Sequence, residues 1–138
     1  MDEIDQQLLR LLRENARAPT TELARRLGIS RTTVQSRIER LERRRIILGY
    51  TVRADGGEAI KAHVMIATAP KVAPAVEAAL RKIPEVRTLH SVSGVYDLIA
   101  IVAARSVGEM DAAIDRIGQL QGVDRTTSSI VLSTRIDR

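Results

Sequence analysis

The chain has 138 residues, 44% of them apolar, which is ordinary for a globular protein that buries a core in one domain or two small ones. Its apolar runs are far shorter than the roughly 20 residues of a membrane span, and its start does not resemble a signal peptide. We therefore expect a cytoplasmic protein without membrane contact. The absence of cysteine excludes disulfides, thiolate zinc sites and cysteine nucleophiles.

The net charge of +5 is concentrated near the N-terminus. Residues 1–50 contain 11 Arg and 7 Asp or Glu, and residues 31–45 alone contain six Arg and two Glu. Such a concentration implies a polyanionic partner. Because two tyrosines are the only aromatic side chains, the composition disfavours base stacking on single strands or RNA and favours a duplex.

A first amphipathic helix is expected from a cap at Asp2 to about residues 15–18, before Pro19. Its apolar stripe consists of Ile4, Leu8, Leu11 and Leu12. This stripe is expected to pack against the two helices that follow, since two short helices cannot enclose a core alone.

Residues 21–41 are expected to form two helices joined by a tight Gly-Ile-Ser turn. Gly28 can take the positive φ that ends the first of them, and Ser30 can cap the second. Their apolar faces consist of Leu23, Ala24, Leu27, Val34, Ile38 and Leu41. The pattern predicts a helix-turn-helix.

The outward faces of the second helix carry hydroxyls and an amide near its start and arginines further along. In a DNA-reading helix-turn-helix, base edges meet the start of this helix and phosphates lie beside its later turns. The candidate DNA-binding residues are Arg31, Thr32, Thr33, Gln35, Ser36, Arg37, Arg40, Arg43 and Arg44. The alternative is an amphipathic helix whose polar side chains contact only water; the focused charge favours DNA.

A short strand is expected at residues 48–53, and a hinge at residues 55–58, where Asp, Gly, Gly and Glu follow one another. We therefore divide the chain into a helix-turn-helix DNA-binding domain (1–50), a strand and hinge linker (51–61) and a second domain (62–138).

The second domain contains an internal repeat. Residues 83–88 recur as residues 120–126, each time after an amphipathic helix and at the start of a strand. Further strands are expected at 62–69 and 97–103. The helices would bury Val72, Val76, Leu80 and Ile83 in the first unit and Val107, Met110, Ile114 and Ile117 in the second, with Ser106 and Glu109 at capping-box spacing.

Two such units give βαββαβ, an antiparallel sheet with both helices on one face. The fold class is therefore α+β, with an N-terminal winged-helix-like helix-turn-helix domain and a C-terminal ferredoxin-like domain. The uncovered face of the sheet is expected to carry Leu89, Ile99 or Ile101, Ile130 and Leu132. An apolar sheet face of this kind marks a subunit interface.

These residues resemble the Lrp/AsnC (feast/famine) family of bacterial and archaeal transcription regulators. The first half resembles the family at Ile4-Asp5, Leu8-Leu9, Leu12, Asn15-Ala16-Arg17, Glu22-Leu23-Ala24, Gly28-Ile29-Ser30, Val34, Arg37-Ile38, Leu41-Glu42, Ile47 and Gly49-Tyr50. The second half resembles it at the loop motif Gly94-Val95-Tyr96-Asp97. The resemblance implies double-stranded DNA as partner, a homodimer formed through the βαββαβ domains that often assembles into octamers, and an amino-acid effector that alters assembly or DNA affinity.

The resemblance also directs attention to an effector site. Asp97 could pair with an α-ammonium group while backbone N–H groups of residues 93–96 receive the carboxylate. The candidate effector-binding residues are Ser93, Gly94, Val95, Tyr96, Asp97, Thr126, Thr127 and Ser129. In the alternative interpretation Gly94 only makes a hairpin turn and Asp97 only caps its strand.

The chain departs from the family pattern at two positions. Pro19 stands where a capping Ser or Thr is frequent, so Thr20 is expected to serve as the cap. Arg45 stands where Gly commonly follows the recognition helix. It must either take a left-handed conformation at roughly 1 kcal/mol or let the helix continue.

Other functions are less well supported by the sequence. His63 and His90 lack a neighbouring His or acid at ligand spacing, and no nucleophile motif or phosphate loop is present, so we expect neither an enzyme nor a metal or cofactor. AsnC-like haem-pathway decarboxylases share the architecture but would be expected to have a pocket rich in aromatic and histidine side chains. An architectural DNA-binding protein without an effector is the other alternative.

Overall fold

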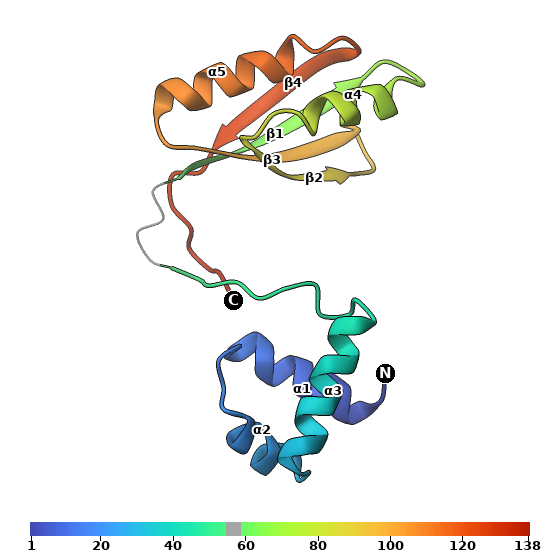
Figure 1. The fold of residues 1–138 in the computed structure, drawn as a ribbon. Helices are drawn as coiled ribbons and strands as arrows, with labels where there is room; N and C mark the ends of the chain where they lie inside the picture. The colour runs from blue at the N-terminus through green and yellow to red at the C-terminus, as the bar shows by residue number, and fades with distance from the viewer. Residues whose placement is uncertain (55–58) are drawn as a thin grey trace. The chain divides into compact units, whose positions relative to one another are not determined.

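The structure is a computed structural model that describes residues 1–54 and 59–138. The hinge expected at residues 55–58 lies outside the described residues. The chain divides into two compact units, residues 1–55 and 56–138 (Figure 1). None of the helices in the described ranges is long and apolar enough to cross a membrane.

The first unit consists of three helices, α1 (Glu3–Glu14), α2 (Thr20–Leu27) and α3 (Arg31–Arg43). The expected caps are present: Asp2 accepts a hydrogen bond from the Asp5 N–H, and Ser30 accepts one from the Thr33 N–H. Gly28 ends α2 with a φ of 68°. All three helices contribute to one core, whose buried members are Leu8, Leu23, Ala24, Val34 and Leu41. The predicted helix-turn-helix is therefore confirmed, as is the packing of the first helix against it.

The cap of α2 differs from the prediction. Thr20 is the first helical residue, and Pro19 is the cap, without a side-chain hydrogen bond. The Pro19 carbonyl accepts hydrogen bonds from the N–H groups of Glu22 and Leu23. With a φ of −60° and a ψ of 144°, Pro19 is extended, and no side-chain hydrogen bond caps the helix.

The segment after α3 also differs from the prediction. Residues 48–54 form no strand, and the side chains of Leu48 and Val52 are more than 80% exposed. A strand requires a neighbouring strand for its N–H and C=O groups. Residues 48–54 take no part in the one sheet found within the described residues.

The second unit has the expected βαββαβ order. Its elements are β1 (Ile60–Thr68), α4 (Ala73–Leu80), β2 (Val86–Ser91), β3 (Leu98–Ala104), α5 (Val107–Gly118) and β4 (Val123–Ile130). The strands lie in the order β2-β3-β1-β4 and are all antiparallel to their neighbours. Both helices cover one face of the sheet (Figure 1), where side chains such as Val64, Val102 and Ile117 are fully buried.

Three residues assigned to the open face of the sheet do not lie there. Leu89 pairs with Ala100 and packs into the core under the helices, because a register shift between Val86 and Thr88 moves it to the other face. Ile130 lies opposite the buried Ala62. Leu132 follows the end of β4 and is 96% exposed. Ile99 and Ile101 do lie on the open face, since they alternate with buried residues of β3.

The prediction for Val107 was also wrong. It is the first residue of α5 and is 69% exposed, whereas Met110 and Ile117 of the same helix are buried. Ser106 caps α5 as expected by accepting from the Glu109 N–H, and the Glu109 carboxylate accepts from the Arg105 N–H.

Candidate functional site

The N-terminal turn of α3 presents a cluster of hydroxyls. The Ser30 hydroxyl shares hydrogen bonds with those of Thr32, at 3.2 Å, and Thr33, at 2.7 Å. Gln35 and Ser36 are exposed on the same helix. The start of α3 therefore carries short donors and acceptors on a rigid element, which is what base edges require.

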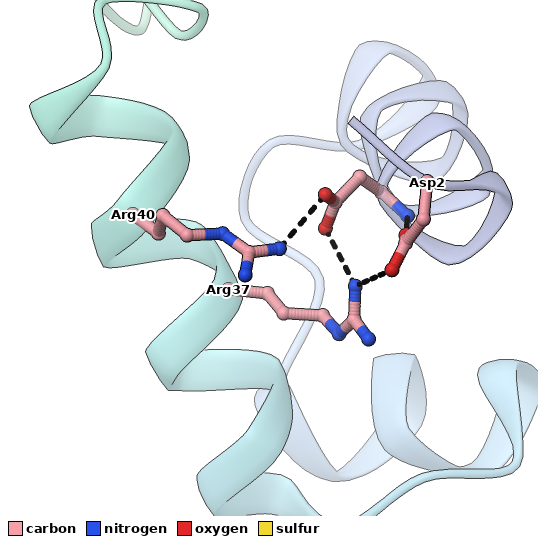
Figure 2. A network of polar contacts seen from close by, with 4 residues as sticks. Asp2, Arg37 and Arg40 are labelled. Carbon is pink, nitrogen blue, oxygen red and sulfur yellow. Dashed lines mark hydrogen bonds and ion pairs between the residues drawn. The ribbon is translucent and has the colours of Figure 1, made fainter.

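The candidate arginines of α3 are not equivalent. Arg31, Arg40, Arg43 and Arg44 are exposed, as expected. The prediction that Arg37 lies on an outward face is wrong, because its side chain is only 20% exposed. Its guanidinium turns toward the start of α1 instead (Figure 2).

Asp2, which caps α1, Asp5 of α1 and two arginines of α3 form a continuous network (Figure 2). The Arg37 Nη1 atom lies 2.6 Å from Asp2 Oδ2 and 3.0 Å from Asp5 Oδ1. The Arg40 Nη2 atom lies 2.9 Å from Asp5 Oδ2. The Asp5 side chain is fully buried, and each of its oxygens has its own arginine. The network thus joins the first helix of the unit to the third.

The network keeps its acids ionised. Burial raises the pKa of Asp5, but the hydrogen bond from Arg37 and the charge of Arg40 outweigh it, so the pKa lies below its usual range. The hydrogen bond from Arg37 also lowers the pKa of Asp2, and the backbone N–H of Asp5 adds to this effect. The two acids raise the pKa of Arg37 in turn.

Sequence reasoning missed this network. Asp2 and Asp5 are three residues apart, as are Arg37 and Arg40, so each pair lies on one face of its helix. Two matched pairs of opposite charge on helices that share a core were the available signal. The separation of more than 30 residues in sequence hid it from local patterns.

A shallow hollow of about 330 Å³ lies on the surface of α3 beside the network. It is lined by Thr32, Thr33, Ser36, Arg37 and Arg40. These side chains offer hydroxyls and guanidinium N–H groups but no carboxylate, so the hollow suits an anion.

In the second unit, Asp97 is tied to β1. Its N–H donates to the Ile66 carbonyl at 2.9 Å, and its Oδ2 atom accepts from the Thr68 N–H at 2.8 Å. Gly94, in the loop between β2 and β3, has a φ of 118°, which favours glycine. The strand-capping role of Asp97 is thus present and uses the Oδ2 atom.

Tyr96 connects this loop to β4. Its hydroxyl shares a 2.5 Å hydrogen bond with that of Thr127, and the Arg125 guanidinium lies 5.2 Å from the centre of its ring. Ser129 lies two residues along the same face as Thr127. Thr126 lies opposite the buried Ile66, on the helix side of the sheet. The structure therefore brings together Tyr96, Asp97 and Thr127, but not Thr126.

A second hollow, of about 460 Å³, begins at the base of the same loop. Ser91 and Leu98, the last pair of β2 and β3, line it. Its other lining residues are Glu77, Leu80, Arg81, Val86, Arg87, Thr88 and Leu89. The hollow combines an apolar floor with charges of both signs.

His63 and His90 lie on β1 and β2. Within residues 1–54 and 59–138, no group of three or more His, Asp or Glu side chains could hold a metal ion.

The first unit thus defines a helix-turn-helix protein of the DNA-binding class, with a second, ferredoxin-like domain attached. Residues 1–42 match the AsnC-type helix-turn-helix domain, and residues 61–138 match the Lrp/AsnC ligand binding domain. The chain belongs to the Lrp/AsnC family of transcriptional regulators.

Individual relatives agree with this assignment over nearly the whole chain. The transcriptional regulator LysM of Saccharolobus solfataricus is 35% identical over 97% of this chain and 95% of its own length. Escherichia coli AsnC is 27% identical, with a TM-score of 0.85 over 100% of this chain and 96% of its own. A feast or famine regulatory protein from M. tuberculosis, solved in complex with L-methionine, is 35% identical, with a TM-score of 0.86 over 99% and 95% of the two chains.

Proposed function

We propose that this regulator binds duplex DNA sequence-specifically through α3 and that an amino acid modulates its assembly or DNA affinity. The carrying observation is the exposed start of α3, where hydroxyls and an amide are held on a helix that ends in exposed arginines. As a DNA-binding regulator, the protein is proposed to act in the cytoplasm.

The proposed contacts divide by chemistry. Base edges would be read from the first turns of α3, by Arg31, Thr32, Thr33, Gln35 and Ser36. Phosphates would be met further along, by Arg40, Arg43 and Arg44. This division predicts different effects on specificity and on salt dependence.

The test compares a selected operator fragment with random duplex over a range of salt. Arg40→Ala should weaken binding to both and lower the slope of log affinity against log salt by about one. Gln35→Ala should weaken operator binding alone, by about 1 to 3 kcal/mol at the affected base pair. Arg10→Ala, an exposed arginine of α1, is the matched charge control. Equal losses on both DNAs for both variants would reject the division.

The effector part of the proposal is supported by the match to a ligand binding domain and by the relative that holds L-methionine. The proposed site is the loop with Ser93, Gly94, Val95, Tyr96 and Asp97, together with Thr127, which is hydrogen-bonded to Tyr96, and Ser129, which lies on the same face of β4. Thr126 faces the helix side of the sheet and is left out of the proposed site. The exposed carboxylate of Asp97 suits an α-ammonium group.

Thermal-shift screening of single amino acids on the purified chain tests this part, since a ligand that binds the native state raises the melting temperature. Asp97→Ala should abolish the shift and the effector's influence on DNA binding. Asp124→Ala, an exposed acid of β4, should retain both. If no amino acid shifts the wild type and DNA binding is sequence-independent with a steep salt slope, the architectural alternative replaces this proposal.

A further inference from the structure

Asp5 is the only charged side chain that is fully buried within the described residues. A buried carboxylate is costly unless it is paired and hydrogen-bonded. Here both oxygens are occupied, Oδ1 by Arg37 and Oδ2 by Arg40. The acid therefore determines where two guanidinium groups of the proposed DNA-reading helix lie.

The two arginines differ in how much of each guanidinium group remains exposed for a further contact. Arg37 shares one nitrogen between two carboxylates and is 20% exposed. Arg40 uses one nitrogen on Asp5 and keeps 45% of its side chain exposed. It also lines the hollow on α3, beside three hydroxyl side chains. Arg40 is thus fixed at one end of its guanidinium and open at the other.

We propose that Asp5 and Arg37 are positioning residues for DNA binding. Arg37 orients the Asp5 carboxylate, and Asp5 holds Arg40 at the hollow, where it meets a backbone phosphate of duplex DNA. Tethering spares Arg40 the loss of side-chain freedom that a free arginine suffers on binding. The inference rests on the proposed function, because it assumes that α3 faces DNA.

Removing Asp5 is expected to change DNA affinity in the opposite direction from removing an exposed acid. Removing an acid near a DNA-binding surface relieves repulsion and should tighten binding to a polyanion. Because Asp5 is buried and acts through Arg40, Asp5→Asn should instead weaken duplex binding, by about two- to tenfold. Glu3→Gln is the matched control. Glu3 is an exposed acid of the same helical turn without a described partner, and its loss should leave affinity unchanged or raise it.

A double-mutant cycle separates positioning from a general effect on the fold. If Asp5 acts through Arg40, Asp5→Asn should cost affinity in the wild type but nothing further in Arg40→Ala. A loss of the same size in both backgrounds would overturn the inference, as would unchanged or tighter binding by Asp5→Asn. Circular dichroism at the assay temperature verifies that each variant is folded.

Arg37→Lys provides a second readout that does not depend on Asp5→Asn folding. Lysine keeps the charge, but its ammonium group ends short of the position of the Nη1 atom that contacts both acids. Binding should weaken in the wild type but no further in Arg40→Ala, because Arg37 acts through Arg40. A loss of the same size in both backgrounds would mean that Arg37 contributes to DNA binding independently of Arg40 and would reject the inference. A wild type that binds no duplex at all would reject the proposed function instead.

Discussion

Arg45 takes a backbone conformation that arginine rarely adopts. Its φ is 57°, and α3 ends two residues before it. The Ile46 N–H donates to the Leu41 carbonyl at 2.9 Å, and the Arg45 N–H to that of Glu42 at 3.0 Å. This is the Schellman arrangement, which usually places Gly at the left-handed position. Of the two alternatives stated for Arg45, the left-handed one is correct.

Replacing Arg45 with Gly should therefore stabilise the first unit. Glycine takes a positive φ without the steric cost of a Cβ, so the gain should be roughly 1 kcal/mol in the free energy of unfolding. Thermal unfolding followed by circular dichroism measures it. Arg44→Gly serves as the control, because Arg44 has a φ of −79° and no such strain to relieve. A gain of equal size in both variants would point to lost charge repulsion rather than to backbone strain.

Asp5 should make the first unit sensitive to acid. Its pKa is lowered in the folded chain, so the folded state favours the ionised carboxylate more than the unfolded state does. The stabilisation is fully present above the unfolded pKa of about 3.9 and is lost as the pH falls through the lower folded value.

Hydrogen exchange of the amides of α1 and α3 reports this loss, because it follows the first unit separately. Protection should fall in the wild type below about pH 4. It should depend less on pH in Asp5→Asn, which has no carboxyl group to titrate there. Parallel pH profiles for the two chains would contradict the assignment to Asp5.

At the scale of elements, local patterns in the sequence predicted most of the structure. Helical periodicity, the caps Asp2 and Ser30 and the repeat of the βαβ units were sufficient to anticipate, in order, all nine helices and strands of the described residues. A tenth element, the strand expected at residues 48–53, is not formed. What could not be predicted depends on non-local contacts. Leu89 changed face because one irregularity in β2 shifts the register.

In the candidate site, too, local features could be predicted from the sequence and non-local contacts could not. The exposed hydroxyls at the start of α3 could be predicted from helical periodicity alone. The position of Arg37 could not, since it depends on acids more than 30 residues earlier in the chain. Asp97 follows its glycine loop directly in the sequence and stays a predicted effector contact, but its hydrogen bond to Thr68 could not be predicted because it depends on the pairing of strands.

The junction between α4 and β4 offers a test of packing between elements. Gly122 precedes β4 with a φ of 97°, and a Cβ at this position would lie 2.9 Å from Cγ2 of Val72 and 3.1 Å from Cγ2 of Val76. Gly122→Ala should therefore destabilise the second unit by roughly 1 to 3 kcal/mol through overpacking and backbone strain.

Gly108→Ala is the matched control in the same unit. Its nearest neighbour would be the Ser106 hydroxyl at 3.9 Å, and alanine favours a helix, so stability should be unchanged or rise by up to roughly 1 kcal/mol. Urea unfolding of both variants measures the difference. Equal stability of the two variants would contradict this prediction, because it would mean that α4 and β4 move apart at no cost to accommodate the added Cβ.

At the scale of the whole molecule, the open face of the second unit's sheet is the surface available to a second copy. Ile99 and Ile101 of β3 lie at its centre, with Met65 of β1 opposite Ile99, and all three are half-buried. One helix-turn-helix reads only a short half-site, so sequence-specific binding is expected to need two. We expect the apolar centre of this face to join two copies of the chain, whose helix-turn-helix units then bind paired half-sites.

Ile101→Asp should separate the copies, because it places an unpaired charge in an apolar interface. Sedimentation equilibrium should give a smaller oligomer, and affinity for a two-half-site operator should fall while affinity for a single half-site stays the same. Val107→Asp is the control, since Val107 is an exposed apolar residue of α5 in the helix layer. Its oligomer size should match the wild type. Should Ile101→Asp keep the wild-type mass while Val107→Asp loses it, the copies would meet through the helices and not through the sheet.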